Sequence, residues 1–166
     1  MKIQLLGTGG AEGIPALYAD SPLSQLARAQ GGRDVRTRSA GLINETLKVD
    51  FGPDTGAHIA RHQLRPMEWE AIFFTHSHDD HLTPSELQYS LFPFTPHEFV
   101  PFTIYGNAEV IRKIEDRYPS WPFELVVSKS FEPIFHGDMT VIPIHAYHKL
   151  EEDAQNLIFD DGKVAF

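Results

Sequence analysis

Short apolar runs, separated by glycine, proline and polar residues, divide the chain into segments with the periodicity of strands and helices. Strands are expected at residues 2–6, 39–44, 47–50, 71–74, 102–106 and 125–127. Helices are expected from about Ser21 to Gly31, from Thr55 to Gln63 and from Ala108 to Arg117. Two hairpins follow, with turns at residues 136–138 and 161–162. Strands and helices therefore alternate along most of the chain.

Residues at the helix starts and between the elements refine this pattern. Three starts carry capping candidates, namely Asp54, Thr83 with Pro84 and Glu86 in a capping box, and Asn107. In the first helix, Leu23, Leu26 and Ala27 are spaced to face one side. Residues 87–101 are aromatic and interrupted by prolines, which argues against a long helix. We expect them to pack in the core, and a hydrophobic wall over the site is the less favoured alternative.

One stretch concentrates the polar chemistry of the chain. The apolar run at residues 71–74 leads into Thr75-His76-Ser77-His78-Asp79-Asp80-His81. Because His76 and His78 are two residues apart, they leave the same face of an extended backbone. Asp80 and His81 follow where the chain must turn before the next helix. A buried strand that ends in a dense loop of ligand types indicates a metal site rather than a solvated polar loop.

The residue types restrict how a metal ion is bound. Neutral imidazole and carboxylate are ligands that Zn(II), Mn(II) and Fe(II) accept. The chain contains no cysteine, so thiolate sites and disulfides are excluded. His58 and His62 stand one helical turn apart without the glutamate of an H-E-x-x-H motif. We interpret these two as surface or cavity-lining residues.

A second pair of histidines, His145 and His148, comes at the end of a later strand. A spacing of three sends their side chains to opposite faces if the strand continues. Only one of them is therefore expected to point at the metal, and spacing alone does not choose between them.

Composition limits the classes of function. With 166 residues, of which 42% are apolar, residues 1–166 are expected to form one domain with its own core. The net charge of −9 argues against a broad grip on nucleic acid, which relies on Lys and Arg. The sequence shows no signal-peptide pattern and no run long enough to span a membrane. We therefore expect a cytoplasmic enzyme that acts on a small molecule.

The central loop matches the H-x-H-x-D-H motif of the metallo-β-lactamase superfamily. Gly7-Thr8-Gly9 after the first strand, Asp50-Phe51-Gly52 at the end of a later strand and His148 extend the match along most of the chain. The chain resembles in particular the branch that contains the phosphoribosyl cyclic phosphodiesterases and the tRNA 3′-processing endonucleases. This resemblance implies an α/β fold of the αββα sandwich type, with two divalent ions, zinc or manganese, at one edge.

The resemblance also implies a set of ligands. His76, His78 and His148 would hold the first ion, and Asp80 and His81 would contribute to the second. Asp80 would in addition act as the catalytic residue that orients the attacking water.

Two supporting roles follow from the same resemblance. Asp50 matches a residue that orients the motif loop, and His145, or a histidine from the family's C-terminal part, would protonate the leaving group. The family also uses a bridging aspartate after a later strand, which the sequence does not match. Asp160 and Asp161 lie before that strand, in a hairpin turn, and are poor substitutes.

These differences predict that the chain is the N-terminal part of a longer domain. The sandwich is then expected to be incomplete in its second half, with one metal ion rather than two held by this chain. A strand edge or apolar face left uncovered favours self-association, so a homodimer is among the expected assemblies.

The implied function is metal-dependent hydrolysis, in which cations lower the pKa of a water from about 15.7 towards about 7. No nucleophilic side chain is then required. The preferred substrate is a small or cyclic phosphodiester. The alternatives are a lactonase or thioesterase, a β-lactamase, disfavoured by the missing signal peptide, and an RNA-processing nuclease, disfavoured by the acidic charge. A non-catalytic metal-binding remnant is the alternative from another class.

Overall fold

The computed structural model describes residues 1–96 and 102–166. The first sheet contains β1 (Ile3–Gly7), β2 (Ala40–Ile43), β3 (Leu47–Val49), β4 (Ala71–Phe73), β5 (Thr103–Gly106) and β6 (Leu125–Val127). The second sheet contains β7 (Ile134–His136), β8 (Met139–His145) and β9 (Gln155–Asp160). The helices are α1 (Pro22–Gln30), α2 (Thr55–His62), α3 (Pro84–Leu87) and α4 (Ala108–Arg117). Short 3-10 turns are η1 (Gly32–Asp34), η2 (Pro66–Glu68) and η3 (Gln88–Ser90).

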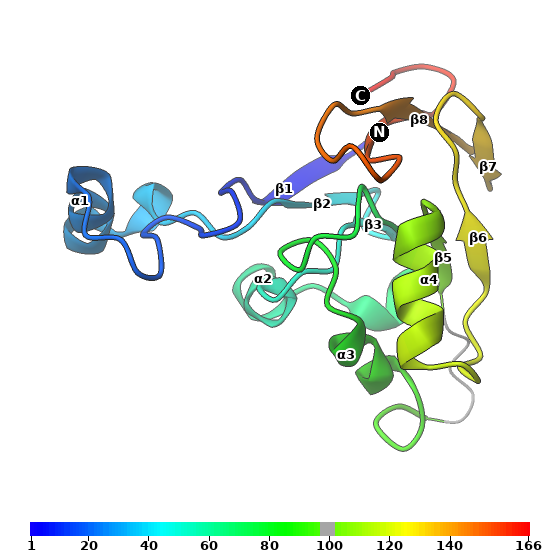
Figure 1. Ribbon diagram of the computed structural model, residues 1–166, viewed down its shortest axis with the longest axis horizontal. Coiled ribbons are helices and arrows are strands. Elements are labelled where there is room, and N and C mark those ends of the chain that lie inside the picture. Colours follow the sequence, from blue (N-terminus) through cyan, green and yellow to red (C-terminus); the bar gives the residue numbers. More distant parts are fainter. Residues whose placement is uncertain (97–101) are drawn as a thin grey trace.

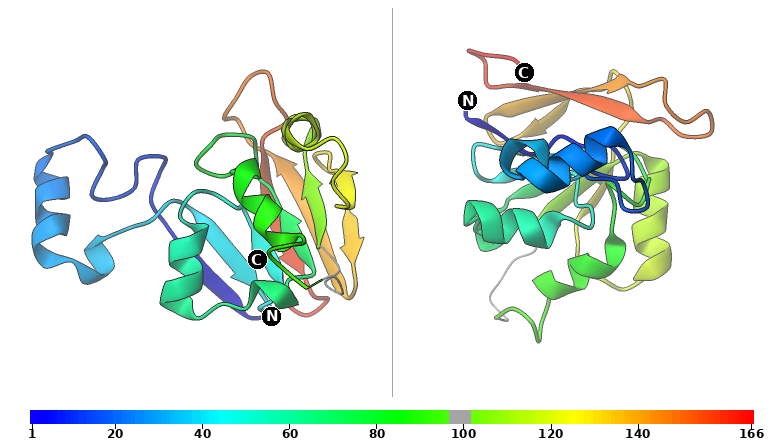
Figure 2. Two further views of the ribbon diagram at one scale, coloured as in Figure 1. Left: turned by 90° about the horizontal axis from the view of Figure 1, so that it is seen from below. Right: turned by 90° about the vertical axis from the view of Figure 1, so that its left-hand side faces the viewer.

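The first sheet combines antiparallel and parallel pairing. β1, β2 and β3 pair antiparallel, whereas β3, β4, β5 and β6 pair in parallel. Parallel neighbours need a crossover, and α2, α3 and α4 provide the crossovers here. These helices lie on one face of the sheet, and the second sheet lies over the other face (Figures 1 and 2). The predicted sandwich is confirmed, although no helix among the described residues covers the outer face of the second sheet.

Alternation along the central strand builds two apolar layers. Ile72 and Phe74 face the helices, whereas Ala71 and Phe73 face the second sheet. All four side chains are at most 1% exposed. A parallel strand covered on both faces is expected to be apolar throughout, as this one is. β4 is therefore fixed in register from both sides, and the histidine loop leaves a rigid strand end.

The segment between β1 and β2 leaves the sheets as an arm that carries α1 (Figure 1). The helix forms where the sequence predicts it. Of its predicted apolar side, however, only Ala27 is buried, because Leu23 and Leu26 are 58% and 50% exposed. The helical spacing was right, but the side that it marks lies away from both cores.

Two of the three predicted caps differ from expectation. The Asn107 side chain accepts hydrogen bonds from the first turn of α4, as predicted. Asp54 precedes α2, but its carboxylate accepts from the backbone and guanidinium of Arg38. Thr83 makes no side-chain cap, so the predicted capping box is wrong. Its backbone N–H instead pairs with the carbonyl of Phe51, which draws this loop towards the end of β3.

The aromatic segment after α3 is less buried than predicted. Leu87 is buried, but Phe92 and Phe94 are 61% and 60% exposed, so the core assignment is wrong for these two. In the described part of this segment, up to residue 96, α3 and η3 are the helical elements, and no long helix forms there. The predicted positions Phe99 and Pro101 lie outside the described residues.

The second predicted hairpin forms only in part. After the turn, the backbone N–H and C=O groups of Phe166 pair with those of Phe159, both at 2.8 Å. Residues 163–166 form a single bridge rather than a full strand. No described helix combines the length and apolar character needed to cross a membrane.

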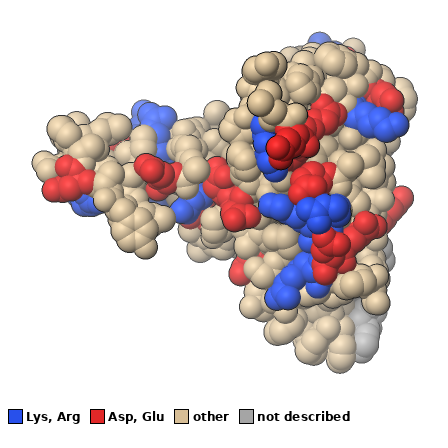
Figure 3. Space-filling view, viewed as in Figure 1, with Lys and Arg blue, Asp and Glu red and all other residues tan. Residues whose placement is uncertain are grey.

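The face that carries α4 mixes charges of both signs. In Figure 3, Lys and Arg lie among Asp and Glu on this face. Arg112 forms ion pairs with Glu109 and Asp116 along the helix, and Lys113 lies 3.7 Å from Asp79. The view in Figure 3 shows no broad area of a single charge.

Ile104 tests the helix-side core. Its side chain is 0% exposed, so Ile104→Ala is expected to lower the free energy of unfolding by about 2–5 kcal/mol through cavity formation. Leu23→Ala, on the exposed side of α1, is the control and is expected to change it by less than about 0.5 kcal/mol. Urea denaturation followed by circular dichroism measures both. Equal losses would contradict this core assignment.

Candidate metal centre

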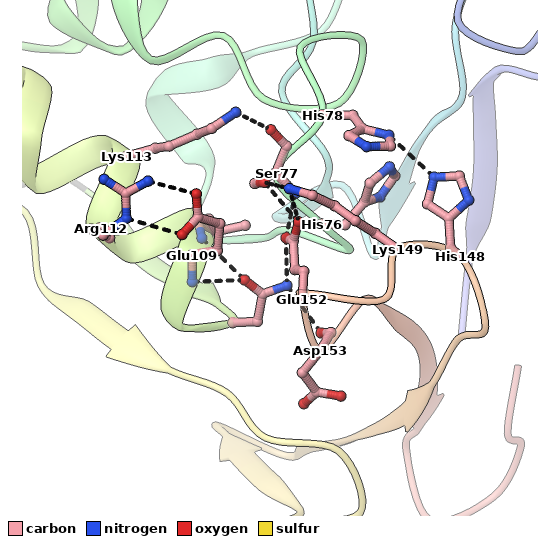
Figure 4. Close-up of polar contacts among 12 residues, drawn as sticks. His76, Ser77, His78, Glu109, Arg112, Lys113, His148, Lys149, Glu152 and Asp153 are labelled. Atoms are coloured by element: carbon pink, nitrogen blue, oxygen red, sulfur yellow. Dashed lines mark hydrogen bonds and ion pairs between the residues drawn. The ribbon is translucent and has the colours of Figure 1, made fainter.

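The carboxyl ends of β3, β4 and β5 meet at one edge of the first sheet. Asp50 follows β3, residues 74–81 follow β4, and Asn107 follows β5. In open α/β sheets, ligands bind beyond the carboxyl ends of the parallel strands. The connection between β8 and β9 reaches the same edge, where His148 lies beside His76 and His78 (Figure 4).

Three histidines from these two loops converge. One ring nitrogen of each of His76, His78 and His148 lies within 4.8 Å of the others. The Nε2 atom of His148 is 3.2 Å from Nδ1 of His78. Figure 4 shows the three rings gathered around a common space. Where spacing did not choose between the two later histidines, the structure places His148 in the cluster.

His76 presents an unpaired nitrogen to this cluster. The Thr75 hydroxyl lies 3.1 Å from both oxygens of Asp50, so it donates to that carboxylate and accepts from Nδ1 of His76 at 2.9 Å. This tautomer leaves Nε2 with a free lone pair, and that buried atom has no hydrogen-bond partner. Burial, with a smaller effect of the nearby His81, lowers the pKa of His76 to about 4 and keeps the ring neutral. A neutral, unpaired nitrogen beside two other imidazoles fits a divalent cation.

Asp50 lies beneath the loop and joins its two ends. The residue is 2% exposed and adopts a left-handed backbone with φ of 55°. Its Oδ1 atom accepts from the backbone N–H of Thr75 at 2.9 Å, and its Oδ2 atom accepts from Nδ1 of His81 at 2.7 Å. Residues 75 and 81 are thereby tied to the end of β3.

Asp80 and His81 bring a further pair of potential ligand atoms close together. Since His81 donates through Nδ1, its Nε2 atom is an acceptor, and it faces Oδ2 of Asp80 at 3.2 Å. Two acceptors at this distance repel each other unless a proton or a cation lies between them. Burial opposes protonation of His81, but the hydrogen bond and charge of Asp50 outweigh it and raise the pKa. The rings of His81 and His76 are 4.2 Å apart, so this pair adjoins the cluster.

Other candidates lie elsewhere. The Nδ1 atom of His145 is 3.0 Å from Asp153, and its side chain is 46% exposed, so it does not join the cluster. The Asp160 and Asp161 side chains accept hydrogen bonds from backbone N–H groups of their own hairpin turn. Neither aspartate is brought to the histidines.

The interpretation of His58 as a surface or lining residue is wrong. The residue is 1% exposed, and its Nε2 atom lies 2.8 Å from the hydroxyl of Thr37. Residue 58 belongs to the one face of α2 that packs inward, together with Thr55. His62, one turn later, is half-buried. The spacing of His58 and His62 predicts that they lie on one side of the helix, but it does not predict whether that side faces the core or the solvent.

Glu152 is a site residue that sequence reasoning missed. Its side chain is buried and accepts hydrogen bonds from the backbone and hydroxyl of Ser77, both at 2.7 Å. It lies four residues after His148 within the acidic run Glu151-Glu152-Asp153. Nothing in that run distinguishes it from its neighbours, and closeness to His148 was the one available hint.

A cavity of about 710 Å³ lies beside the cluster, between the two sheets. Its polar lining includes Asp50, Thr75, His76, His81 and His148. Much of the remaining wall is apolar and includes Ile43, Val49, Leu157 and Phe159. The size and the mixture of an apolar wall with a few convergent polar groups are typical of small-molecule sites.

Solved structures with the same arrangement of elements define the fold. A diphosphatase from the PhnP family superposes with a TM-score of 0.73 at 20% identity, over 98% of this chain and 63% of that chain. Zn(2+)-bound PqqB from Methylobacterium extorquens superposes with a TM-score of 0.76 at 16% identity, over 99% of this chain and 63% of that chain. YhfI from Bacillus subtilis, a metallo-β-lactamase fold protein, superposes with a TM-score of 0.66 at 17% identity, over 98% of this chain and 60% of that chain. The chain has the metallo-β-lactamase fold, as its central motif predicted.

Sequence relatives are more specific. Ribonuclease Z of Methanococcus maripaludis is 33% identical over 117 residues, which are 69% of this chain and 32% of that protein. Ribonuclease Z of Lactobacillus johnsonii is 25% identical over 150 residues, 86% of this chain and 43% of that protein. No protein-family model matches the chain. The predicted resemblance to the tRNA 3′-processing branch is confirmed as a sequence similarity, and the chain spans less than half the length of these relatives.

Gly52 lets the ligand loop approach the end of β3. A Cβ atom at this position would lie 2.0 Å from the backbone oxygen of Asp80. Gly52→Ala is therefore expected to lower the free energy of unfolding by roughly 1–3 kcal/mol. Gly56→Ala is the matched control, because its Cβ would meet no atom within 4 Å and alanine favours the helix by up to about 1 kcal/mol. Denaturant unfolding of the metal-free variants measures both, and a Gly52→Ala protein as stable as the wild type would contradict the close approach.

Proposed function

We propose that this chain is part of a metal-dependent hydrolase of phosphodiesters, with a divalent cation held by His76, His78 and His148. The observation that carries the proposal is the buried, unpaired Nε2 atom of His76 facing the ring nitrogens of the other two. Zn(II) and Mn(II) accept such neutral imidazole ligands. The names of similar proteins, two ribonucleases and a diphosphatase, support phosphate esters as the substrate class.

A second cation belongs to the same proposal. Asp80 and His81 offer two ligand atoms 3.2 Å apart beside the first three. Two ligands hold an ion less firmly than three, so this chain alone is expected to keep one ion, and the complete site two. The choice between zinc and manganese is part of the proposal.

In the proposed mechanism, a divalent cation held by His76, His78 and His148 would supply Lewis-acid chemistry, lowering the pKa of water from about 15.7 towards about 7 and offsetting charge on the phosphoryl group. The remaining tasks belong to the chain. The Asp80 carboxylate accepts a hydrogen bond from the attacking water and directs its lone pair at phosphorus. Asp50, through its bonds to Thr75 and His81, holds the loop in register for this. His145 is held by Asp153 away from the cluster, so we assign it no step.

A small or cyclic phosphodiester is the preferred substrate, because the cavity beside the cluster is about 710 Å³. RNA is the second candidate, since both curated relatives are ribonucleases, and they weigh against the expectation that nucleic acid is unlikely. The mixed charges in Figure 3 offer a polyanion no broad basic area on that face.

We also propose that residues 1–166 are the N-terminal part of a longer domain. The chain spans 32% and 43% of the two relatives and 63% of two of the similar structures. Among the described residues, the second sheet has three strands against six in the first, which leaves part of the first sheet for further strands to cover. The cytoplasmic location and the homodimer stay predictions.

The ligand set is tested by a matched pair of variants. Loss of a group that hydrogen-bonds to a metal ligand weakens metal binding by roughly 10–100-fold. His148→Ala removes a proposed ligand itself and is expected to weaken Zn(II) binding by more than this. His145→Ala removes an imidazole of the same connection that lies outside the cluster, and its affinity should equal that of the wild type. Competition with a chromophoric chelator measures both. Unchanged affinity in His148→Ala would remove this residue from the ligand set.

The substrate class is tested by turnover with Zn(II) or Mn(II). A chromogenic phosphodiester and a cyclic nucleotide are expected to be cleaved, with loss of cleavage in His76→Ala. Turnover of only a thioester or lactone would contradict the phosphodiesterase proposal, and cleavage of only a 3′-extended RNA would favour the second candidate. Stoichiometric metal without any turnover would favour a non-catalytic protein. Absence of bound metal under metal-replete conditions would contradict the proposal as a whole.

A further inference from the structure

Ser77, between two of the clustered histidines, is held at every polar atom. Its backbone N–H and its hydroxyl donate to the two oxygens of Glu152, each at 2.7 Å. Its carbonyl oxygen accepts from Nζ of Lys113 at 2.6 Å. The residue is 0% exposed. Because Ser77 is bonded to both His76 and His78, fixing it also fixes the backbone from which both imidazoles project.

The Glu152 carboxylate joins three segments of the chain. Besides Ser77 after β4, it accepts from the side-chain amide of Asn107 at 2.8 Å and from Nζ of Lys149 at 3.0 Å. Asn107 begins α4, and Lys149 directly follows His148. Figure 4 shows Ser77 and Lys149 meeting the Glu152 carboxylate beside the histidines. The loop of His76 and His78 and the loop of His148 therefore share one anchor.

This anchor is ionised. Burial by itself raises the pKa of Glu152, but the hydrogen bonds from Asn107, Ser77 and Lys149 outweigh it and lower the pKa to about 2. Hydrogen bonds to an ionised acceptor are stronger than those between neutral groups. A neutral side chain of the same size would therefore hold the same donors less firmly.

We propose that Glu152 is a positioning residue of the metal centre, which holds segment 76–78 against the His148 loop so that the three ring nitrogens meet before any ion binds. It acts through Ser77 and Lys149, the residues that adjoin the histidines in the chain. Ordering both loops in advance removes a conformational cost from binding. The consequence for metal affinity rests on the proposed function, whereas the ordering of the two loops does not.

Glu152→Gln keeps the size of the side chain and removes its charge. Zn(II) affinity is expected to fall about tenfold, which is the smaller effect seen when a residue that supports a metal ligand is replaced. The visible absorption of the Co(II)-substituted protein should change as well, because it reports ligand geometry. In the metal-free protein, hydrogen exchange should become faster in residues 75–82 and 146–152.

Glu109→Gln is the matched control. Glu109 lies in the first turn of α4, and its carboxylate pairs with Arg112 at 2.6 Å rather than with Ser77. The same chemical change there should leave affinity, absorption and exchange as in the wild type. If Glu152→Gln does not fold, Ser77→Ala removes only the hydroxyl contact and should shift all three readouts in the same direction. In the double variant the two effects should not add, because they act on one contact.

Unchanged exchange in Glu152→Gln or Ser77→Ala would overturn the proposed anchor. Faster exchange with unchanged affinity and Co(II) absorption would overturn its role at the metal centre. A wild-type protein that binds neither Zn(II) nor Co(II) would overturn the proposed function instead. In that case the exchange comparison with Glu109→Gln would still decide whether Glu152 holds the two loops together.

Discussion

The hydrogen bonds of the buried Asp50 carboxylate are the contacts on which the geometry of the site depends. A carboxylate that is 2% exposed is costly unless donors surround it, and here the donors are the backbone and hydroxyl of Thr75 and the ring of His81. If either Thr75 or His81 moved away, the buried charge of Asp50 would lose a hydrogen-bond donor. The same bonds select tautomers, since Nδ1 of His81 must carry its proton and the Thr75 hydroxyl must accept from His76. One carboxylate thus determines which nitrogens of two histidines face the cluster.

The fold explains why a carboxylate can be held there. β3 and β4 pair in parallel, so both strands end at the same edge, and Asp50 lies directly beneath the loop that leaves β4. The next two residues keep that loop close. The backbone of Phe51 pairs with that of His81 and Thr83, and Gly52 leaves room for the carbonyl of Asp80. In the sequence, residues 50–52 look like no more than the end of a strand. In the structure they are the surface against which the histidine loop packs.

Local signals carried most of what could be predicted. Alternation at residues 71–74 and the cap at Asn107 depend on neighbours in the sequence, and both are found in the structure. The sequence did not predict which way a loop or a helix face is turned, because that depends on residues far away in the sequence. The choice of His148, the burial of His58 and the exposure of Phe92 depend on how a loop or helix is turned towards the rest of the molecule.

Glu152 shows the same limit most clearly. Its partners Ser77 and Asn107 are 75 and 45 residues away in the sequence. An acidic residue in an acidic run is usually solvated, and only the folded chain brings these donors to it. By contrast, the dense motif of residues 76–81 was informative because its ligands are close in sequence as well as in space.

The cluster is also unfavourable to the fold unless something binds in it. Four imidazoles, those of His76, His78, His81 and His148, pack with the ring centroids of neighbouring pairs 4.2 to 4.9 Å apart. An unpaired buried nitrogen such as Nε2 of His76 costs about 1–3 kcal/mol, and the facing atoms of Asp80 and His81 repel each other whenever His81 is neutral. Cations bound at the two proposed positions would satisfy these groups, and by mass action they would stabilise the folded state that displays them. Local conflicts of this kind are expected where a sequence serves function rather than stability. The side chains that make residues 76–81 unfavourable as core are therefore the same ones that make this segment a candidate metal site.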